Sequence, residues 1–196
     1  MGEDKQIYLV RHGESEGNAG LPSEDHTKIP LTATGMEQAK MVPDQLPWAP
    51  QLIVVSPFLR ARQTAQPTIE RYPDVPVEVW PEVCEFTYLA PDSCRGTTSA
   101  ERRPRVDAYW ALNDPYHYDG EGAESFDALT SRAKQAVKHI QDCPQIRIVI
   151  FSHAQFIRIL KDVLANPTDT VETRMARFRS LPRIQNCEGA LLTVPN

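Results

Sequence analysis

The stretch "IRIVIFS", residues 146–152, decides which fold the rest of the chain can adopt. Its Ile, Val and Phe residues run almost without interruption, which is typical of a strand buried on both faces of a sheet. Sheets buried in this way are mostly parallel, and parallel neighbours need long, usually helical connections. We therefore expect helices before and after this strand in the sequence.

Outward from this strand, short β-branched runs alternate with longer amphipathic stretches. Further strands are predicted at 6–10, 51–56, 75–80 and 189–194. Helices are predicted at 32–46, 59–72, 99–113, 125–141 and 154–166. The alternation predicts an α/β fold with a largely parallel central sheet that helices cover on both sides.

Prolines refine these predictions. Pro43 is expected to limit or kink the helix that Thr32 or Thr34 caps, and Pro67 to disturb the middle of the following helix. The prolines around 75–80 indicate a short strand near an edge of the sheet.

The chain of 196 residues is long enough for a single α/β domain, 1–196, with a sizeable core. The segment 85–122 has the weakest strand signal, so we expect a lid-like excursion over one end of the sheet. The net charge of −5 does not favour nucleic acid or an anionic membrane as a partner. An anion site would have to be built locally, from a few cations gathered in space.

No apolar run approaches the length of a membrane span, and the first residues, "MGEDKQ", do not resemble a signal peptide. The four cysteines are scattered without CxxC spacing, which favours reduced thiols in a cytoplasmic protein. The sequence leaves the oligomeric state open.

Suggestive residues follow three of the predicted strands. Arg11, His12 and Gly13 follow the first strand, Ser56 leads from the second into "PFLRARQTA", and His153 follows the central strand. In open α/β sheets, ligands bind outside the carboxyl ends of the strands. We therefore expect His12, His153 and an arginine of "LRARQ", Arg60 or Arg62, to meet in one crevice.

Two arginines and two histidines around a crevice suit a tetrahedral oxyanion such as phosphate. Guanidinium groups would keep His12 neutral, as a nucleophile must be, and would offset charge on the phosphoryl oxygens. Gly13 would let the backbone approach the anion, and Ser15 and Asn18 could add neutral hydrogen bonds. A carboxyl group is the natural proton source for the leaving alkoxide.

Four stretches, "LVRHGESEGN", "SPFLRARQTA", a glutamate at the head of the lid segment and "FSHAQFIRIL", together resemble the histidine phosphatase superfamily, the phosphoglycerate mutase-like proteins. "PLTATGMEQA" and "GEGAESFDALTSRA" also resemble family segments, so the resemblance covers nearly the whole chain in the right order. It implies a three-layer α/β/α sandwich with a mostly parallel sheet, and an enzyme that uses no metal and no cofactor.

The resemblance also implies a role for individual residues. His12 would be the phosphorylated nucleophile, and Glu85, or less favourably Glu82, would be the proton donor. Arg11 and His153 would complete the phosphate pocket together with Arg60, which matches the family arginine because it directly precedes Ala61. Phosphate or substrate contacts would come from Gly13, Ser15, Asn18 and Ala154.

Two departures from the family pattern leave the substrate open. Ala154 stands where many members have glycine, which bears on how the backbone there meets phosphate. After Glu85, "FTYLAPDSCRG" matches neither the continuation typical of the phosphatases nor that of the mutases.

The favoured function is hydrolysis of a small phosphorylated metabolite through a phosphohistidine intermediate. Alternatives are mutase-type phosphoryl transfer, dephosphorylation of phosphohistidine or another phosphoprotein, and a non-catalytic phosphate-binding scaffold. A metal site of His12, Glu14 and His153 is disfavoured, because the set lacks ligand spacing and is crowded by arginines.

Other residues are given less specific expectations. A second anionic group of the substrate could be steered by arginines in the lid segment, Arg95, Arg102 and Arg103, for which a solvated helix face is an equal alternative. Three histidines are expected at the surface: His26, His117 and His139. Three aromatic residues could line the cleft, although helix core is the commoner role in such a pattern: Tyr88, Tyr109 and Trp110.

Overall fold

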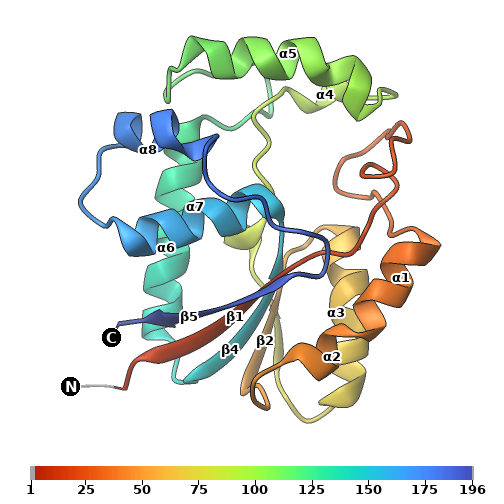
Figure 1. The fold of residues 1–196 in the computed structure, drawn as a ribbon, viewed down its shortest axis with the longest axis vertical. Helices are drawn as coiled ribbons and strands as arrows, with labels where there is room; N and C mark the ends of the chain where they lie inside the picture. Colours follow the sequence, from red (N-terminus) through yellow and green to blue (C-terminus); the bar gives the residue numbers. More distant parts are fainter. Residues whose placement is uncertain (1–2, 196) are drawn as a thin grey trace.

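A computed structural model describes residues 3–195. Its centre is a five-stranded sheet in the order β3-β2-β4-β1-β5 (Figure 1). The strands are β1 (Lys5–Arg11), β2 (Leu52–Val55), β3 (Val77–Val79), β4 (Arg147–Ser152) and β5 (Gly189–Val194). All neighbours are parallel except β1 and β5, which pair antiparallel. The predicted mostly parallel sheet is therefore confirmed, with β3 at one edge as its prolines indicate.

Helices cover both faces of the sheet in three layers, as predicted. The α-helices of residues 3–195 are α1 (Ala33–Lys40), α2 (Val42–Gln45), α3 (Leu59–Arg71), α4 (Pro91–Cys94), α5 (Ser99–Leu112), α6 (Phe126–Asp142), α7 (Ala154–Ala165) and α8 (Val171–Phe178). Ile7 and Leu9 of β1 face the core that α6 and α7 close, whereas Val10 faces the core beneath α2 and α3. Because side chains alternate along a strand, β1 contributes side chains to the cores on both faces of the sheet.

Two helix predictions are corrected in detail. The helix predicted at 32–46 is two helices, since α1 ends at Lys40 and Pro43 lies in the first turn of α2, where a missing N–H costs little. Thr32 is the N-cap, and its hydroxyl accepts a hydrogen bond from the backbone N–H of Gly35. The helix α3 instead runs through Pro67 without a break.

The segment between β3 and α6 carries the short helix η1 (Pro81–Val83), α4 and α5. Figure 1 shows α4 and α5 at the top of the molecule, apart from the helices that flank the sheet. Thr98 and Glu101 form a reciprocal capping box that starts α5. Tyr109 is only 2% exposed and packs in the larger core. It is therefore a core residue of α5 and not part of the cleft lining, and its packing holds α5 to the domain.

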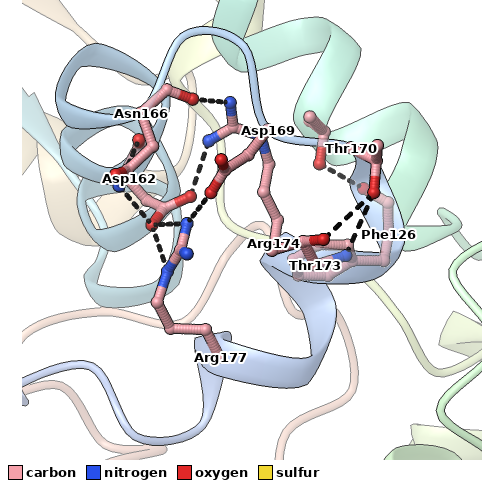
Figure 2. A network of polar contacts seen from close by, with 9 residues as sticks. Phe126, Asp162, Asn166, Asp169, Thr170, Thr173, Arg174 and Arg177 are labelled. Atoms are coloured by element: carbon pink, nitrogen blue, oxygen red, sulfur yellow. Dashed lines mark hydrogen bonds and ion pairs between the residues drawn. The ribbon is translucent and has the colours of Figure 1, made fainter.

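The helix α8, which the sequence analysis does not assign, is attached to α7 by a buried charge network (Figure 2). Asp162 of α7 accepts hydrogen bonds from Arg174 at 2.6 Å and from Arg177 at 2.7 and 2.9 Å. Arg174 also donates to the carbonyl of Asn166. This network fixes the start of the segment that returns past β1 to form β5.

Among residues 3–195, no helix is long and apolar enough to cross a membrane.

Candidate active site

The site is built where three parallel strands end side by side. Register pairs Arg11 of β1 with Ser152 of β4, and Val55 of β2 with Phe151 of β4. The residues that follow these strands are therefore neighbours, and the ring centroids of His12 and His153 are 5.2 Å apart. The sequence expectation that the two imidazoles meet at one edge of the sheet is confirmed.

His12 is 4% exposed, and its two ring nitrogens have different partners. Nδ1 lies 2.7 Å from the carbonyl oxygen of Gly13, so Nδ1 carries the proton. Nε2 then keeps a lone pair and accepts a hydrogen bond from Nε of Arg60 at 3.2 Å. Burial, and after it the Arg60 guanidinium, holds the pKa of His12 well below its ordinary value of 6.5. The ring is neutral at physiological pH.

Arg60 is the arginine of "LRARQ" that enters the site, whereas Arg62 is exposed. It lies in the first turn of α3, its Nη1 donates to the carbonyl of His26 at 2.7 Å, and its guanidinium lies 5.0 Å from the ring centroid of Phe58. Burial lowers the pKa of Arg60 to about 10, so the group remains charged at neutral pH.

His153 is fully buried, and Ser56 holds it through a 2.8 Å contact between Oγ and Nε2. Its Nδ1 is buried without a partner among the described residues. Burial and the Arg60 charge hold the pKa of His153 well below 6.5. Because buried polar atoms are rarely left unpaired, this nitrogen marks a position where a ligand is expected.

These shifts predict how pH acts on the folded protein. Below about pH 6.5, histidines of the unfolded chain take up protons that His12 and His153 do not. The free energy of unfolding should therefore fall with decreasing pH, by up to about 1.4 kcal/mol per pH unit for each ring. Urea titrations between pH 7.5 and 5.5 would measure this, with His12→Asn and His153→Asn each expected to remove one share. A flat profile over that range contradicts the neutral, buried state.

Arg11 leaves β1 beside His12, and its Nη1 donates to the carbonyl of Ile184 at 2.7 Å. Glu85 follows η1 and lies across the first turn of α7, where its carboxylate accepts backbone N–H bonds from Gln155 at 3.4 Å and Phe156 at 3.2 Å. The electrostatic field of Glu85 reaches Arg11, Arg60 and also Arg158 of α7. Ser152 keeps the glutamate segment in place, because its hydroxyl donates to the carbonyl of Val83 at 2.6 Å.

The other residues predicted to contact phosphate or substrate lie near His12 and Arg11: Gly13, Ser15, Asn18 and Ala154. A Cβ on Gly13 would meet the carbonyl oxygen of Gly35 at 2.6 Å, so helix packing demands glycine at this position. Ser15 and Asn18 close the loop after β1, where the Asn18 amide oxygen accepts from the Ser15 N–H at 3.3 Å. Ala154 begins α7 and lines a pocket together with Arg11.

Two pockets adjoin the cluster. The Glu85 pocket, of about 210 Å³, is lined by Ser23, His26, Ile29, Phe58, Arg60, Glu85, Phe86, Thr87, Tyr88, Leu89, Pro91, Cys94, Arg102 and Val106. The arginine pocket, of about 420 Å³, is lined by Arg11, Tyr88, Val106, Trp110, Ala154, Gln155, Arg158, Phe178, Arg179, Arg183 and Ile184. Tyr88 and Val106 belong to both, so the two pockets are adjacent.

Several expectations are corrected here. His26 is half-buried and lines the Glu85 pocket. Arg102 lines the same pocket, but Arg95 and Arg103 form exposed ion pairs with Asp92 and Asp107 and line neither of the two pockets. Glu82 does not line either pocket and pairs with His139, which stacks on Trp80.

Two residues that sequence reasoning missed hold the backbone around His12. Thr64 of α3 accepts a hydrogen bond from the Gly13 N–H at 3.0 Å, and Asn186 donates to the His12 carbonyl at 2.9 Å. Thr64 stands four residues after Arg60, a spacing that puts both on one face of a helix and could have pointed to it. Asn186 carries no comparable signal, because it stands in an irregular stretch before β5.

Among residues 3–195, no group of three His, Cys, Asp or Glu side chains is arranged to bind a metal ion. Glu14, the imagined third ligand, instead accepts a hydrogen bond from the Thr32 hydroxyl at 2.7 Å.

Comparison with known proteins agrees with this geometry. The model of the histidine phosphatase superfamily (branch 1) matches residues 7–182. An adenosylcobalamin/alpha-ribazole phosphatase of Salmonella typhi is 30% identical over 197 residues, covering 97% of this chain and 96% of that protein. The alpha-ribazole phosphatase structure from Shigella flexneri superposes with a TM-score of 0.75 at 24% identity, covering 97% of this chain and 94% of that one.

A mycobacterial glucosyl-3-phosphoglycerate phosphatase also has a TM-score of 0.75, at 23% identity, covering 97% of this chain and 91% of that one. At such identities the two solved structures show that the fold is shared.

Proposed function

Since the chain belongs to the histidine phosphatase superfamily, we propose that it is a phosphomonoester hydrolase that acts through a phosphohistidine at His12. The observation that carries the proposal is the Nε2 lone pair of His12, which a buried, neutral ring presents beside the Arg60 guanidinium. A nucleophile of this kind is needed for attack on phosphorus, and the adjacent cations offset charge on the phosphoryl oxygens.

In the proposed first step, the phosphoryl group lies against Arg11, Arg60 and the free Nδ1 of His153. The lone pair on Nε2 of His12 forms the P–N bond while the P–O bond to the leaving alcohol breaks. Glu85 gives its proton to that oxygen. The ring becomes positively charged, and the Gly13 carbonyl, 2.7 Å from Nδ1, stabilises the charge.

In the second step, water attacks phosphorus and breaks the P–N bond. Glu85 takes the proton from this water, inorganic phosphate leaves, and His12 is neutral again. Glu85 is suited to both steps because it lies in a pocket that the substrate would share with Arg60. Gly13, Ser15, Asn18 and Ala154 are proposed to shape the phosphate site around these groups.

A small phosphorylated metabolite fits this site better than a phosphoprotein. Arg102 and Val106 of α5 line the Glu85 pocket of about 210 Å³, which supports the proposal that the segment 85–122 covers the leaving group. The names of the relatives, which include an alpha-ribazole phosphatase, support a small substrate. The four cysteines are unpaired, which supports the predicted cytoplasmic location.

The experiment that tests the proposal is hydrolysis of 4-nitrophenyl phosphate by the purified protein before and after dialysis against EDTA. We expect equal rates before and after dialysis, because the steps above use only side chains. We also expect inhibition by vanadate, which resembles the phosphoryl group in the transition state of its transfer. Loss of activity with EDTA that zinc restores would contradict the metal-independent mechanism. Vanadate binding without hydrolysis of any compound in a broad phosphomonoester panel would favour a phosphate-binding scaffold.

A further inference from the structure

The arginine pocket adjoins the Glu85 pocket, with which it shares Tyr88 and Val106. Arg11, which follows the first strand into the proposed phosphate site, belongs to it, as does Ala154 at the start of α7. No carboxylate is among the residues that line it. Four guanidinium groups line this pocket, those of Arg11, Arg158, Arg179 and Arg183. This concentration of positive charge is unusual in a chain whose net charge is −5.

Arg158 and Arg11 donate hydrogen bonds to the backbone of the loop that contains Arg183. Arg158 donates to the carbonyl of Leu181 at 2.9 Å, and Arg11 donates to the carbonyl of Ile184 at 2.7 Å. The backbone is thus held on both sides of Arg183. The charge network between α7 and α8 holds the helix that precedes this loop (Figure 2), and the Arg183 side chain itself is exposed.

The other two arginines, Arg179 and Arg183, have few partners of opposite charge. Among the described residues, the Arg183 guanidinium makes no hydrogen bond and no ion pair, although its charge lowers the pKa of Arg158, after burial. Arg179 has one ionic contact, at 3.7 Å to the half-exposed Asp107, which is too long for a hydrogen bond. Glu85 offsets part of the charge of Arg11 and Arg158, but no carboxylate lines the pocket itself. An anion bound there would reduce the repulsion between the arginines.

We infer that the arginine pocket binds a second anionic group, a carboxylate or a phosphate, on the same substrate whose phosphoryl group reacts at His12. This inference rests on the proposed function and adds to it the class of substrate. Guanidinium groups bind either group through paired N–H donors, and Arg11 joins the two sites into one continuous surface.

The Glu85 pocket is less suited to a second anion. Its two lining arginines are already engaged, since Arg60 donates to His12 and Arg102 donates to the carbonyl and hydroxyl of Thr97. The pocket also contains the Glu85 carboxylate. A negative charge there would be desolvated next to another negative charge. An anionic substituent is therefore directed to the arginine pocket, and the two pockets sort substrates by charge.

The test compares 3-phosphoglycerate with glycerol 3-phosphate, which carries a hydroxymethyl group in place of the carboxylate. A second arm compares 1,3-propanediol bisphosphate with 3-hydroxypropyl phosphate and so distinguishes a phosphate from a carboxylate. The variants are Arg183→Ala and, as a matched control, Arg71→Ala, an exposed arginine at the far end of α3. The wild-type enzyme should prefer the more anionic member of at least one pair.

Arg183→Ala should lower kcat/KM for the preferred substrate with two anionic groups about tenfold, the value of one charge-assisted hydrogen bond. It should change kcat/KM for the compound with a hydroxyl in place of the second anionic group less than about twofold. Arg71→Ala should change neither. Equal effects of Arg183→Ala on both members of each pair, or no effect on either, would overturn the inference.

Failure of the proposed function would be seen separately, as absence of 4-nitrophenyl phosphate hydrolysis by the wild-type protein. In that case calorimetric titration of 3-phosphoglycerate and 1,3-propanediol bisphosphate into His12→Ala, with and without Arg183→Ala, still decides whether the pocket binds a second anion. Binding that Arg183→Ala weakens about tenfold supports the pocket, and binding that it leaves unchanged refutes it.

Discussion

Replacing His12 by alanine is expected to lower kcat for 4-nitrophenyl phosphate by at least about 10⁴-fold, because the variant lacks the atom that attacks phosphorus. Arg11, Arg60 and His153 remain, so the substrate should still bind, and KM should change far less than kcat. Steady-state kinetics measure both. Rapid quenching in alkali, where P–N bonds survive, should trap a phosphoenzyme in the wild-type protein and none in the variant.

His117→Ala is the matched control. It removes a half-buried imidazole that contacts Tyr109 and lines neither of the two pockets, so it should leave kcat within about twofold of wild type. Turnover by His12→Ala above about one per cent of wild type would show that another group attacks phosphorus. A phosphoenzyme that persists in the variant would show the same.

The sequence predicts the framework of this site because its signals are local. The continuous apolar run of β4 identifies a central strand, and strand ends predict where His12 and His153 meet. Hydrogen bonds between backbone groups then fix the register, so two residues that follow neighbouring strands must be close. Arg60 is predictable for a similar reason, since it lies in the first turn of the helix that follows β2.

What the sequence leaves open depends on contacts between distant segments. Asn186 reaches the His12 carbonyl from an irregular loop, and nothing in its neighbourhood indicates that contact. Of the three arginines expected to steer an anion, Arg95 and Arg103 are paired with nearby aspartates, whereas Arg183, which is not among the three, is left without a partner. Counting arginines in a segment cannot separate these cases, because pairing is decided only when the chain has folded.

The helix α8 was missed for a related reason. Its eight residues are too few to give a clear periodic pattern, although Thr170 is an N-cap whose hydroxyl accepts from the Thr173 N–H. Its buried face includes Arg174, a residue that hydropathy assigns to solvent. The carboxylate of Asp162, from another helix, supplies the charge that makes this burial possible, and the carbonyl of Asn166 accepts a further hydrogen bond.

Replacing Asp162 by alanine is therefore expected to lower the free energy of unfolding by about 3–5 kcal/mol, the usual cost of leaving a buried charge unpaired. The Asp162 side chain is 2% exposed and the Arg174 side chain 0%, so water cannot take the place of the carboxylate without opening the α7–α8 contact. Urea denaturation at pH 7.5 measures the loss. The double variant Asp162→Leu, Arg174→Met should recover much of it, since an apolar pair of similar size carries no desolvation cost.

Asp169→Ala provides the control, because Asp169 binds the same Arg177 but its side chain is 28% exposed. Ion pairs at that exposure contribute less than about 1 kcal/mol, so this variant should stay near wild-type stability. If Asp162→Ala were no less stable than Asp169→Ala, the network would not be what holds α8 to α7. Since α8 leads directly into the loop of Arg179 and Arg183, Asp162→Ala should also weaken any preference for the more anionic substrate, whereas Asp169→Ala should preserve it.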